Sequence, residues 1–341
     1  ISFYEIFSAL SRSFLDAITP VVLNEFFLKS YTLIILLFHG FKFIDFSTFL
    51  ILYISGYLIK LFILSIINFY NKRLSFTLKL SDLNYSELFK FGLYVFAGGL
   101  SIMIVTRLDM LMIGYLLDLE QVAFYTLAFY IGNAIAIPGR SVISISVPLI
   151  SKAWENQDIK EIDMIYSKSA INQLIVSGLL FLVVWLNIDD VLSLLPEKFS
   201  YGKWVVFYIG LAQLVNMSCG VNGAIIVNSK YYKYDLYTNL ILLAITVLLN
   251  FLLIPIFGIN GAAMATAFSI IFFNLIRLII IYNKIQIQPF SLKTLLTIIL
   301  LILVYLICFK LDFNNVFLSI AVKTILSATL FISICIKANL S

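Results

Sequence analysis

The segment FAGGLSIMIVTRLDMLMIGYLL, residues 96–117, decides the fold class of this chain. It is apolar over a length that can cross a lipid bilayer, yet it carries Arg107 and Asp109 near its middle. Charged side chains in hydrocarbon cost free energy, and where they occur they tend to mark function. The segment therefore predicts a membrane-spanning helix whose two charges need an explanation.

The whole chain has the composition of an integral membrane protein. Of its 341 residues, 62% are hydrophobic and 12% are charged, and the mean hydropathy is +1.05. Apolar runs of roughly 18 to 25 residues cover most of the length, and each can cross about 30 Å of hydrocarbon. We predict an all-α, polytopic helical bundle with no separate soluble domain. Its membrane helices are expected at 20–38, 46–70, 91–117, 122–150, 170–187, 204–228, 235–256, 260–282, 294–309 and 316–336.

The basic residues between these helices predict the orientation in the membrane. One set of helix ends carries fourteen Lys and Arg residues, whereas the opposite set carries only Lys42, Lys198, Lys203 and Lys310. We assign the first set to the cytoplasm, which places the C-terminus inside. The net charge of +5 then reflects contact with anionic membrane lipid and not with nucleic acid.

The longest cytoplasmic connection, residues 151–170, allows two interpretations. Trp154, Ile159, Ile162 and Ile165 alternate with charged residues, as in an amphipathic helix lying on the membrane surface. The same residues could instead continue the membrane helices into the cytosol. Neither interpretation implies catalysis.

A weak internal repeat predicts the domain organisation. Residues 8–60 can be laid over 223–277, which aligns Gly40 with Gly258 and Lys60 with Arg277. The repeat predicts two six-helix lobes around a central cavity, the first of them truncated. We expect a remnant of the first lobe at 1–73, a cytoplasmic connection at 74–90, a complete lobe at 91–284 and an extra helix pair at 285–341. Residues 1–10 read as the tail of a further helix, and the chain as a fragment.

Few residues suit covalent chemistry. The three cysteines, Cys219, Cys308 and Cys335, lie in apolar runs, which argues against disulfides and a zinc site. Asp189 and Asp190 are adjacent, and we expect a solvated loop pair and not an acid and base. Neither a phosphate-binding loop nor a metal-ligand or cofactor motif is recognisable. The sequence predicts a protein that moves a molecule and is not an enzyme.

The central third resembles a known family. The stretch TRLDMLMIGYLLDLEQVAFYTLAFYIGNAIAIPGRSVISISVPLISKAW, residues 106–154, is similar to the seventh and eighth helices of O-antigen (Wzx-type) polysaccharide flippases. RLDMLMIG at 107–114, AFYTLAF at 123–129 and Pro148, which is expected to end its helix, carry the likeness. FGINGAAMATAFSIIFFNLIRL, residues 257–278, resembles a later turn between two helices. These flippases belong to the multidrug/oligosaccharidyl-lipid/polysaccharide exporter superfamily.

The resemblance implies a function in lipopolysaccharide assembly. Such a protein would lie in the bacterial inner membrane and carry an undecaprenyl-pyrophosphate-linked oligosaccharide to the outer leaflet by ion-coupled alternating access. Its partners would be the lipid-linked oligosaccharide, membrane lipids and other polysaccharide-assembly proteins. A multidrug exporter of the same superfamily is an alternative, although the helix pair at 294–336 argues against it. A glycan polymerase or ligase is a second alternative, but the short outer connection at 188–203 disfavours it.

A pyrophosphate that crosses hydrocarbon needs compensating cations, and the planar fork of Arg suits phosphate oxygens. Five cations lie within predicted helices: Lys60, Arg107, Arg140, Arg277 and Lys323. Arg277 is expected to snorkel to the cytoplasmic surface, and Lys323 is open to the same reading. Lys60, Arg107, Asp109 and Arg140 are the candidate cavity residues, and Asp109 and Glu25 are candidate sites for a coupling ion.

Arg107 and Asp109 are two positions apart, about 200° around a helix, so they do not face one another. Arg107 lies about 15 Å below Leu117 at 1.5 Å per residue, near mid-membrane. The two charges could line a cavity for cargo or coupling ion, or they could form a structural charge pair through a neighbouring helix.

The other candidates also leave two readings open. Arg140 follows Pro138 and Gly139, a break that could serve a gate or a static kink. Lys60 shares a helix face with Tyr53, Gly56 and Tyr57, and that face could line a polar cavity or simply pack. Glu25 and Lys29 have the spacing of a solvated ion pair.

Overall fold

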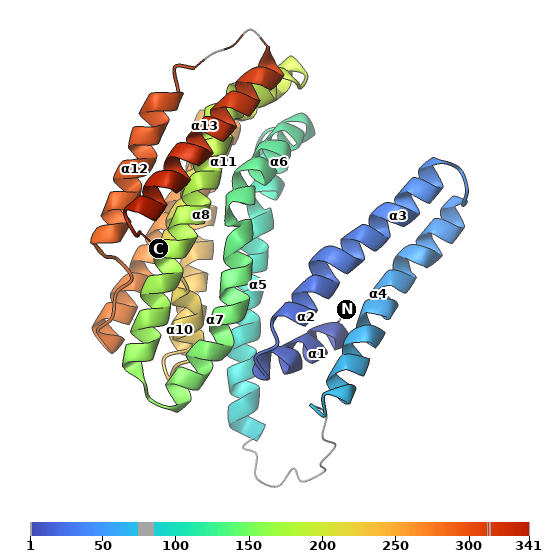
Figure 1. Ribbon diagram of the computed structural model, residues 1–341, viewed down its shortest axis with the longest axis vertical. Coiled ribbons are helices and arrows are strands. Elements are labelled where there is room, and N and C mark those ends of the chain that lie inside the picture. Colours follow the sequence, from blue (N-terminus) through green and yellow to red (C-terminus); the bar gives the residue numbers. More distant parts are fainter. Residues whose placement is uncertain (1, 74–84, 312, 314, 341) are drawn as a thin grey trace. The chain divides into compact units, whose positions relative to one another are not determined.

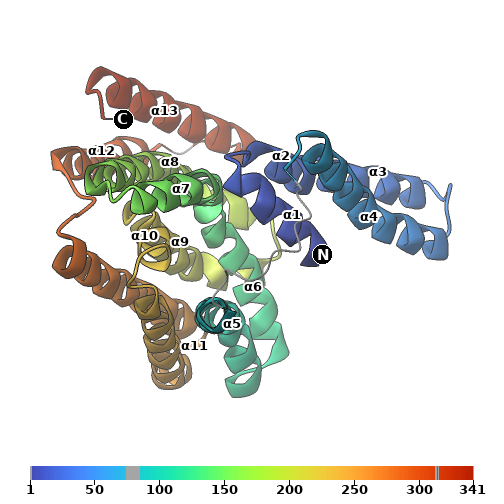
Figure 2. The ribbon, with the colours of Figure 1, turned by 90° about the horizontal axis from the view of Figure 1, so that it is seen from below.

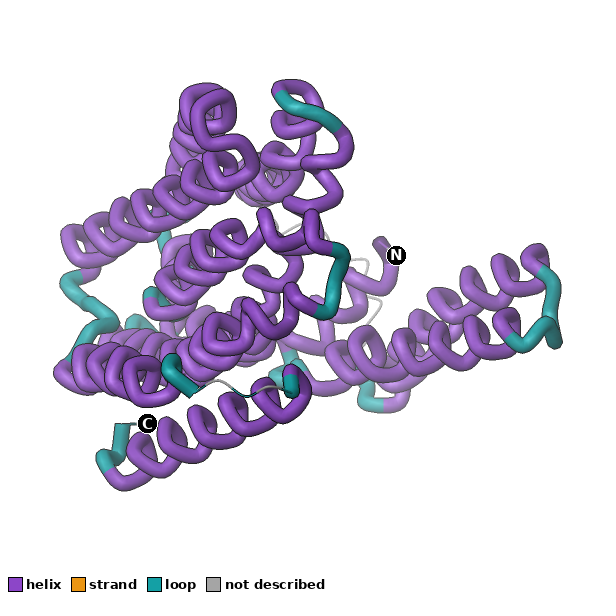
Figure 3. The backbone as a smooth tube through the Cα atoms, turned by 90° about the horizontal axis from the view of Figure 1, so that it is seen from above, coloured by secondary structure: helices purple, strands orange, loops and turns teal. Residues whose placement is uncertain are grey.

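The computed structural model describes residues 2–73, 85–311, 313 and 315–340. These residues form helices and connecting loops without a strand, as Figure 3 shows. Seven of the described helices are long and apolar enough to cross a membrane, and Leu292–Cys308 is a shorter apolar helix. The predicted fold class, a polytopic helical membrane protein, is confirmed.

The chain divides into two compact units, Ile1–Asn84 and Tyr85–Ser341, which we call unit 1 and unit 2. The predicted connection at 74–90 falls at this division. Residues 74–84 lie outside the described part of the chain, whereas residues 85–90 already belong to a helix. The repeat and the two lobes remain predictions.

Unit 1 contains the segments α1 (Ser2–Ser13), α2 (Ile18–Val21), the π-helical η1 (Val22–Phe27), α3 (Leu28–Gly40) and α4 (Phe46–Tyr70). Helices α3 and α4 form an antiparallel hairpin (Figure 1). The Asp45 side chain caps α4 by accepting a hydrogen bond from the Thr48 backbone N–H at 3.4 Å. Tyr4 and Leu64 belong to the small core that joins α1 to α4.

Unit 2 is larger. Its elements are α5 (Tyr85–Leu116), α6 (Leu119–Asn133), η2 (Ala134–Ala136), α7 (Ile137–Glu155), α8 (Ile159–Ser193), η3 (Glu197–Gly202), α9 (Lys203–Ser218), α10 (Asn222–Val227), α11 (Lys233–Ile285), α12 (Leu292–Cys308) and α13 (Val316–Lys337). Helix α9 packs on α6, α8 and α11, and Figure 2 shows it enclosed between α8 and α11. Helix α13 packs on α8.

Two predicted helices are interrupted. The span expected at 122–150 consists of α6 and α7 with a short 3-10 segment between them. Pro138 lies in the first turn of α7, where its missing N–H leaves no hydrogen bond unmade. The span expected at 204–228 breaks between α9 and α10, where Gly220 has a φ of +60° and packs against Ser169 and Ala170.

The end of α7 corrects one prediction and decides another. Pro148 lies inside α7 and does not end it, because the helix continues to Glu155. A short turn follows, and α8 begins at Ile159 with Asp158 as its N-cap. Residues 151–170 therefore continue the membrane helices, and the alternative of a separate surface helix is wrong.

Helix α11 contains both spans that we predicted at 235–256 and 260–282. Gly258 separates them with non-helical dihedral angles, φ 60° and ψ −138°. After the kink, small buried residues follow one another: Gly261, Ala262, Ala263, Ala265, Thr266, Ala267 and Ser269. Small side chains let helix backbones approach closely where no water drives association, so this half of α11 can pack tightly against its neighbours.

Candidate functional site

Lys60 of α4 lines a groove in unit 1 with a volume of about 610 Å³. Its ammonium group donates a hydrogen bond to Asn24 Oδ1 at 2.8 Å and lies 4.1 Å from the centre of the Tyr4 ring. Tyr53 and Tyr57 line the same groove, and their hydroxyl oxygens are 3.0 Å apart. Three residues of the predicted face thus line one groove, whose wall also contains leucine side chains.

Gly56, the fourth residue of that face, has a packing role. A Cβ at this position would lie 2.8 Å from the Tyr31 ring of α3, so the helix hairpin closes on Gly56. The face predicted from spacing is therefore divided between a groove and a helix contact.

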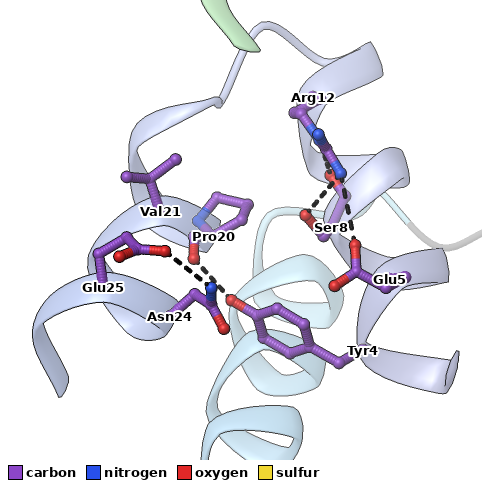
Figure 4. A pocket seen from close by; sticks show the side chains of 8 residues that line it. All are labelled: Tyr4, Glu5, Ser8, Arg12, Pro20, Val21, Asn24 and Glu25. Atoms are coloured by element: carbon purple, nitrogen blue, oxygen red, sulfur yellow. Dashed lines mark hydrogen bonds and ion pairs between the residues drawn. The ribbon is translucent and has the colours of Figure 1, made fainter. Parts of the chain in front are cut away.

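A smaller cavity of about 140 Å³ shares Asn24 and Glu5 with the groove. Figure 4 shows its lining: Tyr4 donates a hydrogen bond to the Pro20 carbonyl oxygen at 2.6 Å, and Asn24 donates one to Glu25 at 3.1 Å. Asn24 and Glu25 belong to η1, a π-helical turn, and such turns occur frequently at functional sites. The predicted pair of Glu25 with Lys29 is present, at 2.5 Å.

Asp109 of α5 is 3% exposed and lies at the centre of a polar cluster in unit 2. Its carboxylate accepts hydrogen bonds from Tyr125 Oη at 2.6 Å, Asn250 Nδ2 at 2.7 Å and Thr266 Oγ1 at 2.5 Å. These donors come from α6 and from both halves of α11. All three are neutral, so hydrogen bonds surround this buried carboxylate and no described cation is paired with it. We call these four residues the Asp109 cluster.

Arg107 lies on the opposite side of α5 and is exposed. Within the described part of the chain, no residue forms an ion pair or a hydrogen bond with it. The hypothesis of a structural charge pair between Arg107 and Asp109 is therefore wrong, because the partners of Asp109 are neutral and Arg107 points elsewhere. An exposed guanidinium at this depth must meet water, a polar cargo or lipid headgroups.

Arg140, in the first turns of α7, is exposed as well. The break before it is closely packed, because Gly139 is buried against Met217 of α9 and Gln173 of α8. Both amide atoms of Gln173 are buried and have no partner among the described residues. The packing of Gly139 favours a static kink, and it leaves the Arg140 side chain at the surface.

Arg277 was expected to snorkel to the cytoplasmic surface, and this prediction is wrong. Its side chain is 7% exposed and forms an ion pair with Asp235, whose side chain is 14% exposed. Thr238 and Asn239, also on the first half of α11, accept further hydrogen bonds from it, at 3.3 Å and 3.2 Å. Arg277 thus holds the two halves of α11 together.

Lys323 of α13 is buried too. Its ammonium group lies 3.0 Å from Asp190 of α8, which also accepts a hydrogen bond from Ser319 at 2.8 Å. Asp189 points away and pairs with Lys203 at 2.7 Å. Asp190 was expected in a solvated loop pair, and instead it anchors the last helix.

One family was found to be similar to part of the chain. Residues 43–176 match the sequence profile of a family described as polysaccharide biosynthesis protein. Lys60, Arg107, Asp109 and Arg140 all lie inside the matched range, whereas Glu25 lies outside it. No match was found among curated proteins, and none among solved structures.

Proposed function

We propose that this protein carries a lipid-linked oligosaccharide, with an undecaprenyl-pyrophosphate carrier, from the inner to the outer leaflet of the bacterial cytoplasmic membrane. The single observation that carries this proposal is Arg107: an exposed guanidinium on α5 that has no partner among the described residues and lies within the range that matches a polysaccharide biosynthesis family. A transmembrane arginine without an internal partner is expected to meet a charged or polar ligand.

The ligand that suits such arginines is an anion with several oxygens. A guanidinium can donate two parallel hydrogen bonds to a phosphate, which an ammonium group cannot do with the same geometry. Arg140 offers a second exposed guanidinium on α7. Both would neutralise the pyrophosphate of the cargo during its passage. Lys60, which already contacts Asn24 and Tyr4, would line the route of the cargo in unit 1.

The Asp109 cluster is the proposed site of the coupling ion. A carboxylate that is 3% exposed and has only neutral partners is costly as a bare anion, so it should bind a proton or a monovalent cation. The cluster also contains an unpaired acceptor, because Asn250 Oδ1 is buried without a partner among the described residues. Together with Thr266 Oγ1, Tyr125 Oη and the carboxylate, it would supply oxygen ligands to sodium.

The mechanism would be alternating access without covalent chemistry, with the C-terminus in the cytoplasm as the basic residues predict. Ion binding at Asp109 would favour one conformation of unit 2 over another, and the ion gradient would supply the free energy. Proteins that assemble the polysaccharide would deliver and receive the cargo.

The test is export of the lipid-linked oligosaccharide in cells or sealed vesicles that carry Arg107 variants. Arg107→Ala should abolish export while the protein still folds, because the exposed side chain has no partner to lose among the described residues. Arg107→Lys should retain part of the activity, since it keeps the charge but not the fork. Lys284→Ala, which removes an exposed cation at the end of α11, is the matched control and should export normally. Normal export by Arg107→Ala would refute the proposal.

A further inference from the structure

A cavity of about 200 Å³ lies in unit 2 between the start of α9 and the kink of α11. Trp204 and Tyr208 line it from α9, and Phe257, Asn260 and Met264 line it from α11. Trp204 is 49% exposed and Phe257 is 50% exposed, so the cavity opens to the surface. The basic-residue pattern predicts that this end of unit 2 faces the outside of the membrane.

The walls of the cavity are mostly aromatic. The rings of Trp204 and Tyr208 are 6.3 Å apart, and Trp185 of α8 lies 5.8 Å from Trp204. Lys203 holds the neighbouring turn through its ion pair with Asp189 and lies 5.7 Å from the Trp185 ring. These rings pack against Trp204 at tilted angles, and the Trp204 side chain itself lines the cavity.

The polar side-chain atoms of the cavity have no hydrogen-bond partner in the part of the chain that the structure describes. No residue in the described ranges makes a hydrogen bond with the indole N–H of Trp204, the hydroxyl of Tyr208 or the amide of Asn260. The Asn260 amide oxygen is buried in addition. Other amides of unit 2 have at least one partner, because the Asn250 amide N–H donates to Asp109 and that of Gln213 donates to Asn133. Buried polar groups normally have a hydrogen-bond partner, so an amide left without one suggests that a ligand supplies it.

Two kinds of ligand could fill an aromatic cavity at a membrane surface. Trp and Tyr are common in interfacial belts, where they contact lipid without specific binding. An acyl chain, however, would leave the amide, the hydroxyl and the indole N–H unpaired. A pyranose ring matches both features: its C–H face is apolar and stacks on an aromatic ring, and its hydroxyl groups donate and accept hydrogen bonds at the edge. The volume corresponds to several water molecules at about 30 Å³ each, which suits one sugar ring.

We propose that this cavity binds a single sugar ring of a saccharide, stacked on Trp204 and hydrogen-bonded to the Asn260 amide. The inference rests on the proposed function, because the sugar would be part of the cargo after it reaches the outer side. The cavity would then hold the oligosaccharide while the pyrophosphate leaves the arginines.

The experiment measures binding of free sugars to the purified full chain in lipid nanodiscs. Methyl glycosides of neutral hexoses and of N-acetylhexosamines serve as probes, and saturation-transfer NMR with titration gives the affinity. Trp204→Leu and Asn260→Leu should each weaken binding about tenfold or more, equivalent to about one hydrogen bond. Asn260→Gln keeps the amide and should fall between Asn260→Leu and the unchanged protein.

Tyr201→Leu is the matched control, because Tyr201 is an exposed aromatic residue just before α9 that does not line the cavity. It should bind sugar within about twofold of the unchanged protein. The proposal is overturned if no probe binds, or if the Trp204 and Asn260 variants bind as well as the control. It is also overturned if native mass spectrometry finds that the unchanged protein retains a phospholipid that Asn260→Leu loses, while neither binds sugar.

Export assays separate this proposal from the proposed function. If the unchanged protein binds sugar through Trp204 and Asn260 but does not export the lipid-linked oligosaccharide, the sugar site stands and the transport proposal fails. If export is normal but no sugar binds in the cavity, only the sugar site fails.

Discussion

Asn250 of α11 donates a hydrogen bond to Asp109 of α5 across 2.7 Å, and this contact joins two helices at the buried centre of unit 2. The residues are 141 positions apart in the chain. The same amide leaves its own oxygen without a partner among the described residues. The pair therefore places a buried carboxylate beside an amide oxygen that could bind an ion.

Replacing Asp109 by Asn should uncouple transport from the driving ion. Asn has the same shape and can still accept hydrogen bonds from Tyr125 and Thr266, so the fold should persist. It carries no charge, so a proton or sodium ion gradient should no longer drive export. Export from vesicles under an imposed sodium or proton gradient measures this, with Asp189→Asn, at an exposed carboxylate, as the control. Gradient-driven export by Asp109→Asn would exclude the cluster as the coupling site.

Arg107 and Asp109 should contribute independently to stability. Asp109→Leu leaves three buried donors without an acceptor and should destabilise the fold, whereas Arg107→Leu removes an exposed group that no described residue contacts through a hydrogen bond or ion pair. The double variant should show the sum of the two effects within about 0.5 kcal/mol. Unfolding in denaturant gives the coupling free energy. Rescue of Asp109→Leu by Arg107→Leu would restore the hypothesis of a charge pair.

The ion pair of Arg277 with Asp235 should matter for stability more than for transport. Arg277→Met leaves Asp235 largely buried without its cation, and such a loss costs about 3 to 5 kcal/mol. Removing both charges in Arg277→Met with Asp235→Leu should recover most of that free energy, since apolar residues can replace a buried pair. Denaturant unfolding of the single and double variants is the measurement, with Lys284→Met as a surface control. A double variant no more stable than Arg277→Met would contradict this account.

The ion pair of Asp16 with Arg73 lies in unit 1, outside the membrane spans, and should be lost in acid. Partial burial raises the pKa of Asp16, but hydrogen bonds from Arg73 and Thr19 outweigh it, so the pKa lies below the ordinary value of 3.8. A lowered pKa means that the ion pair stabilises the folded chain above about pH 3.8 and that this stability is lost as the pH falls through the lowered pKa.

Hydrogen exchange of the α1–α2 turn measures this effect. At neutral pH, Arg73→Met should exchange faster there than the unchanged protein, and the difference should vanish in acid. A difference of equal size at neutral pH and in acid would show that Arg73 acts by packing alone.

Membrane spans could be predicted where length and apolarity decide them. Helix α4 occupies the predicted 46–70 because a continuous apolar run lies between the Asp45 cap and the polar turn at Asn71. The interruption at 134–136 lies just before the break that Pro138 and Gly139 indicated, whereas the one at 219–221 was not predicted, because hydropathy does not depend on backbone angles. Gly220 carried a signal, since a glycine in a membrane helix can mark a break, but many such glycines do not.

The candidate site was predicted in part. Spacing alone brought Tyr53, Tyr57 and Lys60 to one groove. The pairing of Arg277 with Asp235 was also within reach: the residues lie 19 positions after and 23 positions before the turn at Gly258 (277 − 258 and 258 − 235), so they have similar depths in a hairpin. The partners of Asp109 could not be found this way, because Asn250 and Thr266 come from helices whose packing against α5 only the tertiary structure shows.

Orientation in the membrane can be decided by two exposed positions in unit 2. Ser200 and Lys230 are both exposed, and the basic-residue pattern predicts Ser200 outside and Lys230 inside. Ser229 would be a poor reporter, because it is 7% exposed and would react slowly from either side. The native cysteines are all buried, so they should not react with a polar reagent. A membrane-impermeant maleimide applied to intact cells should therefore label Ser200→Cys and not Lys230→Cys, and after permeabilisation it should label both. Labelling of Lys230→Cys alone in intact cells would reverse the orientation and, with it, the outward position of the cavity at Trp204.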